Sequence, residues 1–185
     1  MNDHSPAHAA SPGVPRRIGF TLLPAPAMTA LLAGDLAGAG DLVGLRLTDF
    51  FLTDRACWLW RYRLDQLAER PQDAPWLARA AVARPHGEVV GYAGFHGGPD
   101  EAGMVEVGYS VAPEFRRQGY ARAMLAELLR LAAAEPAVHT VRATISPDNE
   151  GSLATIRGFG FVAVGEQWDE VDGLELIFEV PARVG

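Results

Sequence analysis

The sequence predicts an α/β sandwich built around a mixed β-sheet. The first observation is the order of its periodic segments: a strand, helices, three strands, a helix, a strand, a helix and two strands. Strands interleaved with helices in this way form a sheet with helices packed on it. The second is size: 185 residues with 49% hydrophobic content suffice for one domain with a sizeable core.

Each element follows from local patterns. Short apolar runs bounded by Gly, Pro, Asn or Asp predict strands at residues 18–23, 76–83, 88–95, 104–111, 138–145, 161–168 and 174–180. Apolar residues at helical spacing predict helices at residues 26–33, 35–43, 53–70, 119–134 and 150–157. Asp35 is a suitable N-cap for the second helix. For the helix at 53–70, Thr53 or Asp54 is the predicted cap, and the predicted apolar face comprises Trp58, Leu59, Tyr62, Leu64 and Leu67.

The two ends of the chain differ in composition. Residues 1–16 are polar and rich in Pro, His and Ala, which predicts a disordered tail. Residues 17–185 are predicted to form a single domain. No apolar run reaches the roughly 18 residues of a membrane span, and no signal-peptide pattern is present. Cys57 is the only cysteine, so no internal disulfide can form and a cytoplasmic location is expected.

Charge narrows the choice of partners. The net charge is −7, with 16 basic and 23 acidic residues. This balance argues against general nucleic-acid binding, which needs a basic face. It is compatible with steering of a cationic partner such as an amine, and equally with a simple contribution to solubility.

The segment at residues 116–121, Arg-Arg-Gln-Gly-Tyr-Ala, is the most informative motif. It follows a strand and the turn at residues 112–115, and it opens a predicted helix. Unpaired backbone N–H groups and the helix dipole make such a place an anion-binding site. Gly119 allows close backbone approach, and two arginines add charge. Taken alone, the same residues also describe an ordinary helix start with solvated arginines.

The surrounding sequence closely resembles the acetyl-CoA-binding segment of the GNAT superfamily of N-acetyltransferases. The family loop reads Gln/Arg-x-x-Gly-x-Gly/Ala, and here its defined positions are Arg116, Gly119 and Ala121. A second family-like segment begins at Asn149, reads Asn-Glu-Gly-Ser, and is followed by Gly-Phe at residues 160–161. The resemblance covers residues 77–180 and is closest to the branch that acetylates the N-termini of ribosomal proteins.

The resemblance implies a fold and an activity. The fold is a GNAT-like, mixed but mostly antiparallel central sheet flanked by helices. The activity is transfer of an acetyl group from acetyl-CoA, a co-substrate, to a primary amine on a protein N-terminus or a small molecule. The amine attacks directly in a ternary complex. A homodimer is common in this family, and neither a nucleic-acid nor a membrane partner is implied.

The resemblance also assigns cofactor-binding positions. Backbone groups of the strand before the loop hold the pantetheine arm, and backbone N–H groups of the loop hold the pyrophosphate. The positions are Tyr109, Ser110, Val111, Arg116, Arg117, Gln118, Gly119, Tyr120 and Ala121. The side chains of Arg116 and Arg117 either reach a phosphate or remain solvated. Asn149 either binds the pantetheine arm or caps the following helix.

Glu106 is the predicted catalytic base. Strand alternation places Glu106, Gly108 and Ser110 on one face and the valines on the other. A half-buried carboxylate has a raised pKa, which suits proton abstraction. The alternative is a carboxylate on a solvated face or in an ion pair. The second carboxylate position of the family is Thr144 here, which is not acidic.

The general acid is where the pattern departs from the family. The usual tyrosine lies seven residues after the asparagine, and that position is Ile156. The substitutes considered are Tyr109, Ser110 and Tyr120; otherwise the thiolate leaves unassisted or through water. This departure motivates an alternative function, an acyl-CoA-binding sensor or interaction protein without efficient catalysis. A further alternative is an unrelated interaction domain in which the loop is incidental.

Several other residues have two readings. Cys57 is expected to be a core cysteine, and the five histidines lack metal-ligand spacing, so no metal is predicted. His96 ends a strand and either lies at the surface or lines the acceptor site. The aromatic residues Trp58, Trp60, Tyr62 and Trp76 are core residues, or some of them wall the acceptor pocket. The last hairpin could present acidity to an amine through Trp168, Asp169, Glu170 and Asp172.

Overall fold

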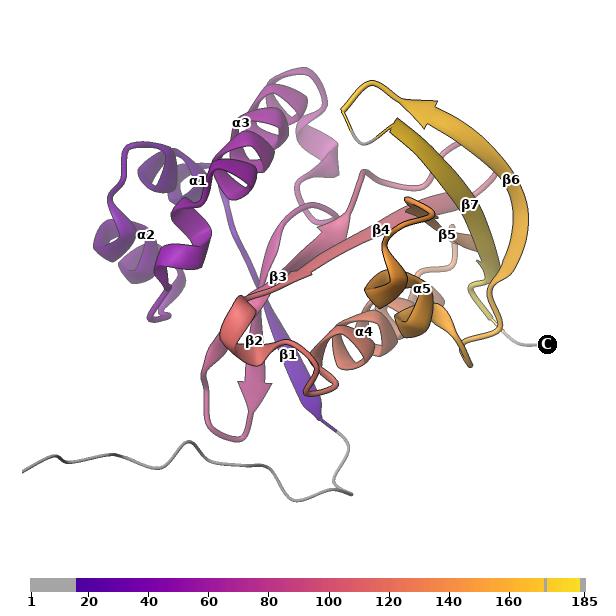
Figure 1. Cartoon of the computed structure of the whole chain (residues 1–185). Helices are drawn as coiled ribbons and strands as arrows, with labels where there is room; N and C mark the ends of the chain where they lie inside the picture. The colour runs from indigo at the N-terminus through magenta and orange to yellow at the C-terminus, as the bar shows by residue number, and fades with distance from the viewer. Residues whose placement is uncertain (1–15, 172, 184–185) are drawn as a thin grey trace, which may run out of the picture.

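The computed structural model describes residues 16–171 and 173–183. Figure 1 shows one sheet with helices on both faces. Its seven strands lie in the order β1-β2-β3-β4-β5-β7-β6. The strands are β1 Arg17–Leu22, β2 Arg79–Arg84, β3 Val89–Phe95, β4 Met104–Val111, β5 Thr140–Ile145, β6 Val162–Asp169 and β7 Gly173–Pro181. The helices are α1 Ala25–Leu32, α2 Leu36–Val43, α3 Asp54–Glu69, α4 Tyr120–Ala134 and α5 Glu150–Ile156. The predicted order of elements is confirmed.

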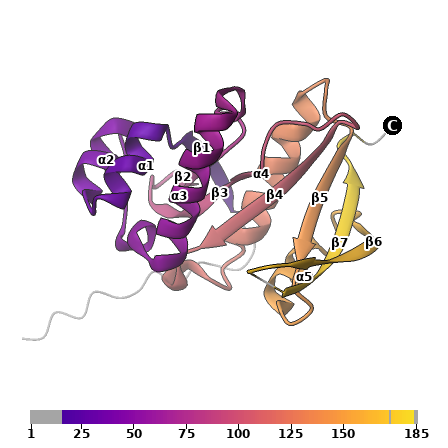
Figure 2. The same cartoon turned by 90° about the horizontal axis from the view of Figure 1, so that it is seen from above.

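The pairing of β4 with β5 sets the geometry of the centre of the sheet. It is the parallel pair in an otherwise antiparallel ladder, and it joins only Met104–Glu106 to Thr140–Arg142. Beyond those three positions β4 pairs on its other edge with β3, and β5 pairs with β7. Figure 2 shows the two strands diverging from their paired ends. The sheet therefore opens into a wedge between the second half of β4 and β5.

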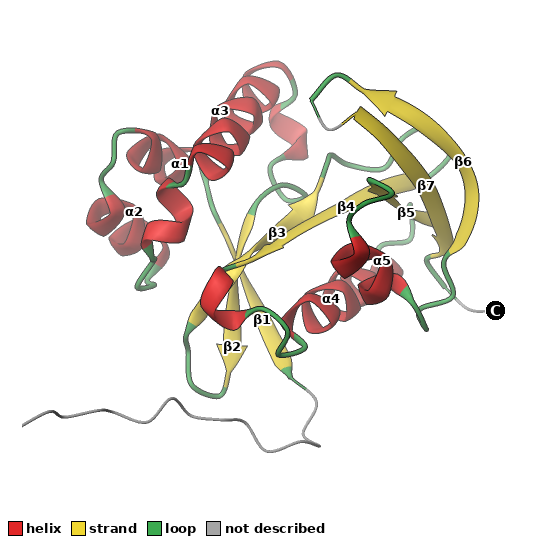
Figure 3. Cartoon of the chain, in the orientation of Figure 1, coloured by secondary structure: helices red, strands yellow, loops and turns green. Residues whose placement is uncertain are grey.

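Two cores lie on opposite faces of the sheet. Strand β2 contributes to both, because Ala81 and Ala83 pack with α4 whereas Ala80 and Val82 pack with α1 and α3. Such alternation is the strand period of two. Buried Met124, Leu125 and Leu128 of α4 fill the first core, and Met28, Leu31, Phe51 and Trp60 fill the second. Figure 3 shows α1 to α3 gathered over one end of the sheet and α4 with α5 under the other face.

Helix α3 forms where it was predicted, but its predicted apolar face is wrong in part. Trp58 and Tyr62 are 44% and 53% exposed, and their rings stack on one another with centroids 5.5 Å apart. The buried residues are instead Ala56, Trp60 and Arg63, spaced by four and three residues. Arg63 is buried because its guanidinium donates to the backbone oxygen of His96 and to the side chain of Gln66. A hydrogen-bonded arginine is thus buried at a position that the predicted apolar face did not include.

Smaller boundaries also differ from expectation. Strand β2 begins at Arg79 rather than at residue 76, because the Arg79 guanidinium donates to the backbone oxygens of Pro75, Trp76 and Leu77 and holds that segment in a turn. Asp35 caps α2 as predicted, accepting from the N–H of Gly38. Thr53 is the N-cap residue of α3, but its hydroxyl donates to the oxygen of Phe50. Residues 1–15 of the predicted tail and Asp172 lie outside the described residues.

Candidate active site

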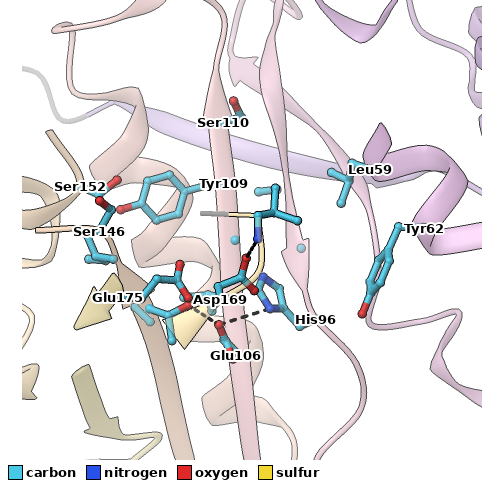
Figure 4. A pocket seen from close by; sticks show the side chains of 18 of the residues that line it. Leu59, Tyr62, His96, Glu106, Tyr109, Ser110, Ser146, Ser152, Asp169 and Glu175 are labelled. Atoms are coloured by element: carbon cyan, nitrogen blue, oxygen red, sulfur yellow. Dashed lines mark hydrogen bonds and ion pairs between the residues drawn. The ribbon is translucent and has the colours of Figure 1, made fainter. Parts of the chain in front are cut away.

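A pocket of about 760 Å³ occupies the wedge between β4 and β5. Its floor comes from residues 107–110 on β4, from residues 143–145 on β5 and from Ser146, which follows β5. Side chains from α3 form one wall and side chains from the β6–β7 hairpin form the opposite wall. Figure 4 shows this arrangement, with Tyr62 and Leu59 on one side and Asp169 and Glu175 on the other. The divergence of the two strands therefore opens a pocket at the centre of the sheet.

The second half of β4 offers an open strand edge to this pocket. From Val107 to Val111 the strand pairs with β3, while β5 has already turned away. Backbone N–H and C=O groups on the wedge side are thus free to pair with an extended ligand, as in strand addition. Tyr109 and Ser110 line the pocket, whereas Val111 lies beyond it. The predicted pantetheine-binding positions are therefore at, or next to, the open edge.

Glu106 projects from β4 into the pocket. Val105 and Val107 are buried on the opposite face, as alternation predicted. One carboxylate oxygen, Oε1, accepts a 2.5 Å hydrogen bond from the hydroxyl of Thr144. The same oxygen lies 3.3 Å from Nδ1 of His96, and the Glu106 side chain is 18% exposed. Glu106 is therefore a half-buried carboxylate held at the point where β4 and β5 separate.

His96 lies beside Glu106 and lines the same pocket. Of the two readings left open by the sequence, its position agrees with the acceptor-site one, although 47% of the side chain remains exposed. Burial lowers the pKa of His96 below its usual value, Arg63 adds to that, and the Glu106 carboxylate opposes it. The only sequence signal for this neighbour was a histidine at the end of a strand, because the local pattern does not show the register that pairs β3 with β4 and joins His96 to Glu106.

The loop after β4 has the geometry of an anion-binding helix start. Arg117 and Gly119 have positive φ angles of 55° and 86°, and α4 begins at Tyr120. The Arg116 side chain donates to the oxygen of Val111 at 3.1 Å, and Gln118 donates to the oxygen of Glu114 at 2.7 Å. These two side chains therefore pin the loop. The Tyr120 side chain is buried, so only its backbone N–H faces a ligand.

Arg16 joins this loop from the start of β1. Its Nε donates to the oxygen of Gln118 at 3.2 Å, and its guanidinium lies 4.8 Å from the centre of the Tyr120 ring. The sequence placed residue 16 in the tail, because nothing local connects it to a loop one hundred residues later. Arg16 thus adds a cation beside the predicted pyrophosphate site.

Asn149 caps α5 through its side chain, which accepts from the N–H of Ser152 at 3.0 Å. Because the cap uses the amide oxygen, the amide nitrogen remains the group available to a ligand in the pocket that Asn149 lines. Ile156 is 5% exposed and packs into the core on the α4 side. The helix therefore supplies no proton donor at that position.

The hydroxyl of Tyr109 lies beneath the wedge near α5. Among the described residues it has no partner with good hydrogen-bond geometry. Burial raises the pKa of Tyr109, and the nearby hydroxyls of Ser152 and Thr155 oppose that rise. Figure 4 shows the ring extending from β4 toward Ser152. Of the substitutes considered for the general acid, Tyr109 thus lines the pocket, but its hydroxyl is buried.

The far end of the pocket combines aromatic surface with carboxylates. Trp58 and Tyr62 form their exposed stack on the α3 wall, and Trp168, 77% exposed, extends from the hairpin. The hairpin also contributes the carboxylates of Asp169, Glu170 and Glu175, while Arg55 lines the α3 side. Trp60, by contrast, is fully buried and donates to the oxygen of Phe51. The aromatic cluster is therefore divided between core and pocket.

Other site types receive no support from the part of the chain that the structure describes. Within residues 16–171 and 173–183, no group of three or more His, Cys, Asp or Glu side chains is placed to hold a metal ion. In those ranges, no helix has both the length and the apolar character needed to cross a membrane. Cys57 is partly buried, with its sulfur 3.6 Å from the oxygen of Leu52.

Comparison with known proteins identifies the family of this domain. A family model for an acetyltransferase (GNAT) domain matches residues 45–162. The chain belongs to the GNAT acetyltransferase family. The matched range contains the wedge, the loop at 116–121 and Asn149. The resemblance inferred from the sequence is thereby confirmed at the level of the family.

A curated relative matches part of the chain. The uncharacterized N-acetyltransferase YjdG of Bacillus subtilis (strain 168) is 36% identical over 81 residues, which are 44% of this chain and 48% of YjdG. The chain thus spans about half the length of this curated relative.

Two solved structures share the fold at low identity. A spermidine N-acetyltransferase SpeG chimera from Vibrio cholerae and hSSAT has a TM-score of 0.63 at 11% identity, covering 90% of this chain and 96% of its own. The ribosomal-protein-S5-alanine acetyltransferase of Vibrio fischeri has a TM-score of 0.61 at 17% identity, covering 90% and 93%.

Proposed function

We propose that this protein transfers the acetyl group of acetyl-CoA to a primary amine, on a protein N-terminus or a small molecule, by direct attack in a ternary complex. The observation that carries the proposal is the open wedge between β4 and β5, with Glu106 at its base and an anion-binding helix start at its end. A thioester is already activated, so the protein needs mainly to hold the two substrates and to remove a proton.

The residues present fit acetyl-CoA as co-substrate. Backbone groups of Tyr109, Ser110 and Val111 on the open edge would pair with the extended pantetheine arm. N–H groups of residues 117–121 would bind the pyrophosphate, assisted by the helix dipole and by the charges of Arg117 and Arg16. The amide nitrogen of Asn149 would donate to the pantetheine arm from the start of α5. Val111, at the end of β4, joins the two parts of this site.

The far end of the pocket suits a protonated amine. Carboxylates of the hairpin would attract the cation, and the Trp58–Tyr62 stack would pack against its carbon atoms. Two fold neighbours are named as enzymes of amine acceptors, spermidine and the alanine of ribosomal protein S5. Those names support an amine as the acceptor class. Within that class, the N-terminus of a ribosomal protein remains one proposed acceptor.

Glu106 would promote deprotonation of the amine, because its negative charge lies in the pocket. Ile156 offers no proton in place of the family tyrosine, so the thiolate would leave unassisted or take a proton that is already in the pocket. This departure is also what favours the second candidate, an acyl-CoA-binding sensor without efficient catalysis. That candidate predicts cofactor binding without an acetylated product.

The first test measures the Tm with and without acetyl-CoA. At one hundred times its Kd, a ligand adds about 2.7 kcal/mol to stability, which raises the Tm by several degrees. Gly119→Trp should remove this shift. Gly34→Trp is the matched control, because Gly34 also has a positive φ, 77°, but is exposed in the α1–α2 turn. No shift in the unaltered protein would exclude both candidate functions.

The second test separates the two candidates. Release of free thiol from acetyl-CoA would be followed with spermidine and with a peptide that begins with alanine. Release that depends on either amine, with acetylated product found by mass spectrometry, supports the transferase. A Tm shift with no product from these or a wider amine panel supports the sensor. A cytoplasmic location and a homodimer also remain proposals, and light scattering would test the latter.

A further inference from the structure

We propose that His96 is the catalytic base of the transfer, and that Glu106 is a positioning residue that orients the imidazole ring. The inference rests on the proposed function and changes the route of the proton within it. The amine would pass its proton to Nε2 of His96, while Nδ1–H donates to Glu106. The argument begins with how the ring is held.

The backbone of His96 is fixed on both sides. Its N–H donates to the oxygen of Glu106 at 2.8 Å, which ties it directly to β4. Its oxygen accepts from Arg63 at 3.0 Å and from Gln66 at 2.8 Å, which ties it to α3. Two elements therefore position a residue that follows directly after β3. Such support from neighbouring hydrogen bonds is what a catalytic side chain needs.

The ring extends over the pocket face of β4. Its Nδ1 lies 3.3 Å from Oε1 of Glu106. Its Nε2 lies over Gly108, where an added Cβ atom would come within 3.0 Å of that nitrogen. Gly108 follows Glu106 by two positions on the same face, toward Ser110 and the open edge. The absence of a side chain at Gly108 thus leaves Nε2 at the floor of the pocket, on the side where the thioester would lie.

The hydrogen bonds of Glu106 suit an orienting partner better than a direct base. Its Oε1 already accepts from Thr144 at 2.5 Å and faces Nδ1 of His96. Figure 4 shows both contacts converging on this oxygen. A carboxylate that accepts from Nδ1–H fixes the tautomer in which Nε2 carries the lone pair. The arrangement is the base-and-orienter logic of other acyl-transfer sites, here built from β3 and β4.

The surroundings of His96 lower its pKa, and burial is the largest cause. Burial lowers the pKa of His96; Glu106 of β4 opposes this and Arg63 of α3 reinforces it. Asp73 of the 3-10 helix Pro71–Asp73 is hydrogen-bonded to Gln66 behind the ring. Across the pocket lie the carboxylates of Asp169, Glu170 and Glu175. A lowered pKa favours a neutral imidazole, which can accept a proton.

The step balances without another reactant. As the neutral amine attacks the thioester carbon, the new N–C bond forms and an N–H proton passes to Nε2. The C–S bond then breaks, and its electron pair stays on sulfur as a thiolate. The imidazolium can return the same proton to that thiolate, giving amide and free thiol. A base that returns its proton requires no separate tyrosine, which agrees with the isoleucine found at position 156.

The kinetic test uses the full chain with spermidine and an alanine-peptide as acceptors. His96→Asn keeps a donor toward Glu106 but removes Nε2, so kcat should fall roughly 10²- to 10⁴-fold with an unchanged Tm shift on adding acetyl-CoA. His86→Asn, at an exposed turn, is the matched control and should leave kcat within about twofold. Activity of His96→Asn close to that of the control would overturn the proposal while leaving the acetyltransferase function intact.

The pH profile of kcat/KM for acetyl-CoA, at saturating acceptor, separates the two assignments. The unaltered protein should lose activity below an apparent pKa lower than 6.5, and His96→Asn should lose this acid limb. Glu106→Gln should keep the limb but move it to lower pH, because the carboxylate raises the pKa of His96. If Glu106→Gln abolishes the limb and His96→Asn retains it, Glu106 is the direct base and the proposal fails.

A readout that does not depend on turnover is the nitrogen NMR spectrum of the imidazole rings. It should show His96 neutral at pH 7, protonated on Nδ1 and unprotonated on Nε2. A ring protonated on Nε2 would overturn the proposal even in an active enzyme. If the unaltered protein acetylates no amine, the proposed function falls and the catalytic role of His96 falls with it, so the two failures are distinguishable.

Discussion

Thr144 on β5 donates a 2.5 Å hydrogen bond to Glu106 on β4, across the point where the two strands stop pairing. This side-chain bond links the two strands beyond the last residues that pair through their backbones. It also consumes one lone pair of the carboxylate that the site uses. A bond between the two strands thus also holds the carboxylate at the base of the wedge.

Thr144→Val should therefore change both stability and turnover. Valine keeps the branched shape but removes the donor to a charged acceptor, which costs about 1.5–3 kcal/mol in general. Because the pair is only part-buried, we expect the lower end of that range, about 1.5 kcal/mol, in urea unfolding. Thr140→Val, on the same strand, serves as the control. Equal stability of the two variants would show that the Thr144 bond contributes nothing.

Trp58→Ala and Trp60→Ala should differ in their effects on stability and on the KM for the amine, although the two residues are only two positions apart. Trp60 is fully buried, so its truncation should cost about 3–5 kcal/mol in denaturant unfolding. Trp58 is 44% exposed on the pocket wall, so its loss should cost less than about 1 kcal/mol. If Trp58 packs on the acceptor, the KM for the amine should rise severalfold. An unchanged KM would remove the α3 wall from the acceptor site.

Arg16→Ala should weaken acetyl-CoA binding, because Arg16 places a cation beside the loop that is proposed to hold the pyrophosphate. We expect a Kd several times higher by calorimetry at low salt, with a smaller effect at high salt because screening reduces the attraction. Arg17→Ala removes the same charge from the neighbouring exposed position and should leave the Kd nearly unchanged. Equal effects of both variants would indicate only a general loss of positive charge.

Tyr109→Phe should not lower stability at pH 7, because the hydroxyl is buried without a well-formed hydrogen bond to a described residue. Burial raises the pKa of Tyr109, so folding favours the neutral phenol. This contribution is present below the unfolded pKa of about 10 and is lost as the pH rises through the higher folded pKa. The unaltered protein should therefore lose more stability than Tyr109→Phe above pH 10, measured by urea unfolding.

The same variant tests a chemical role. With the proton returned by His96, Tyr109→Phe should keep kcat within about threefold. A loss of 10²-fold or more, at unchanged acetyl-CoA binding, would instead identify Tyr109 as the missing acid.

Elements with local signals were predictable. The Asp35 cap, the loop at residues 116–121 and the alternation that sends Glu106 away from the buried valines all depend on neighbours within a few residues. The exposure of Trp58 and Tyr62 was not predictable, since apolar spacing cannot show which stripe of a helix meets the sheet. The burial of Arg63 depends on acceptors supplied by distant residues.

By itself, the sequence determined the order of the elements, the family loop with its helix start, and Glu106 as the carboxylate on β4, because short-range periodicity and backbone chemistry encode them. Tertiary structure alone decided that β4 and β5 part after three residue pairs, that Arg16 reaches the loop, and that His96 lies against Glu106. The physical reason is that these contacts depend on the register and divergence of paired strands and on side-chain packing between elements, and such contacts leave no periodic trace in the sequence.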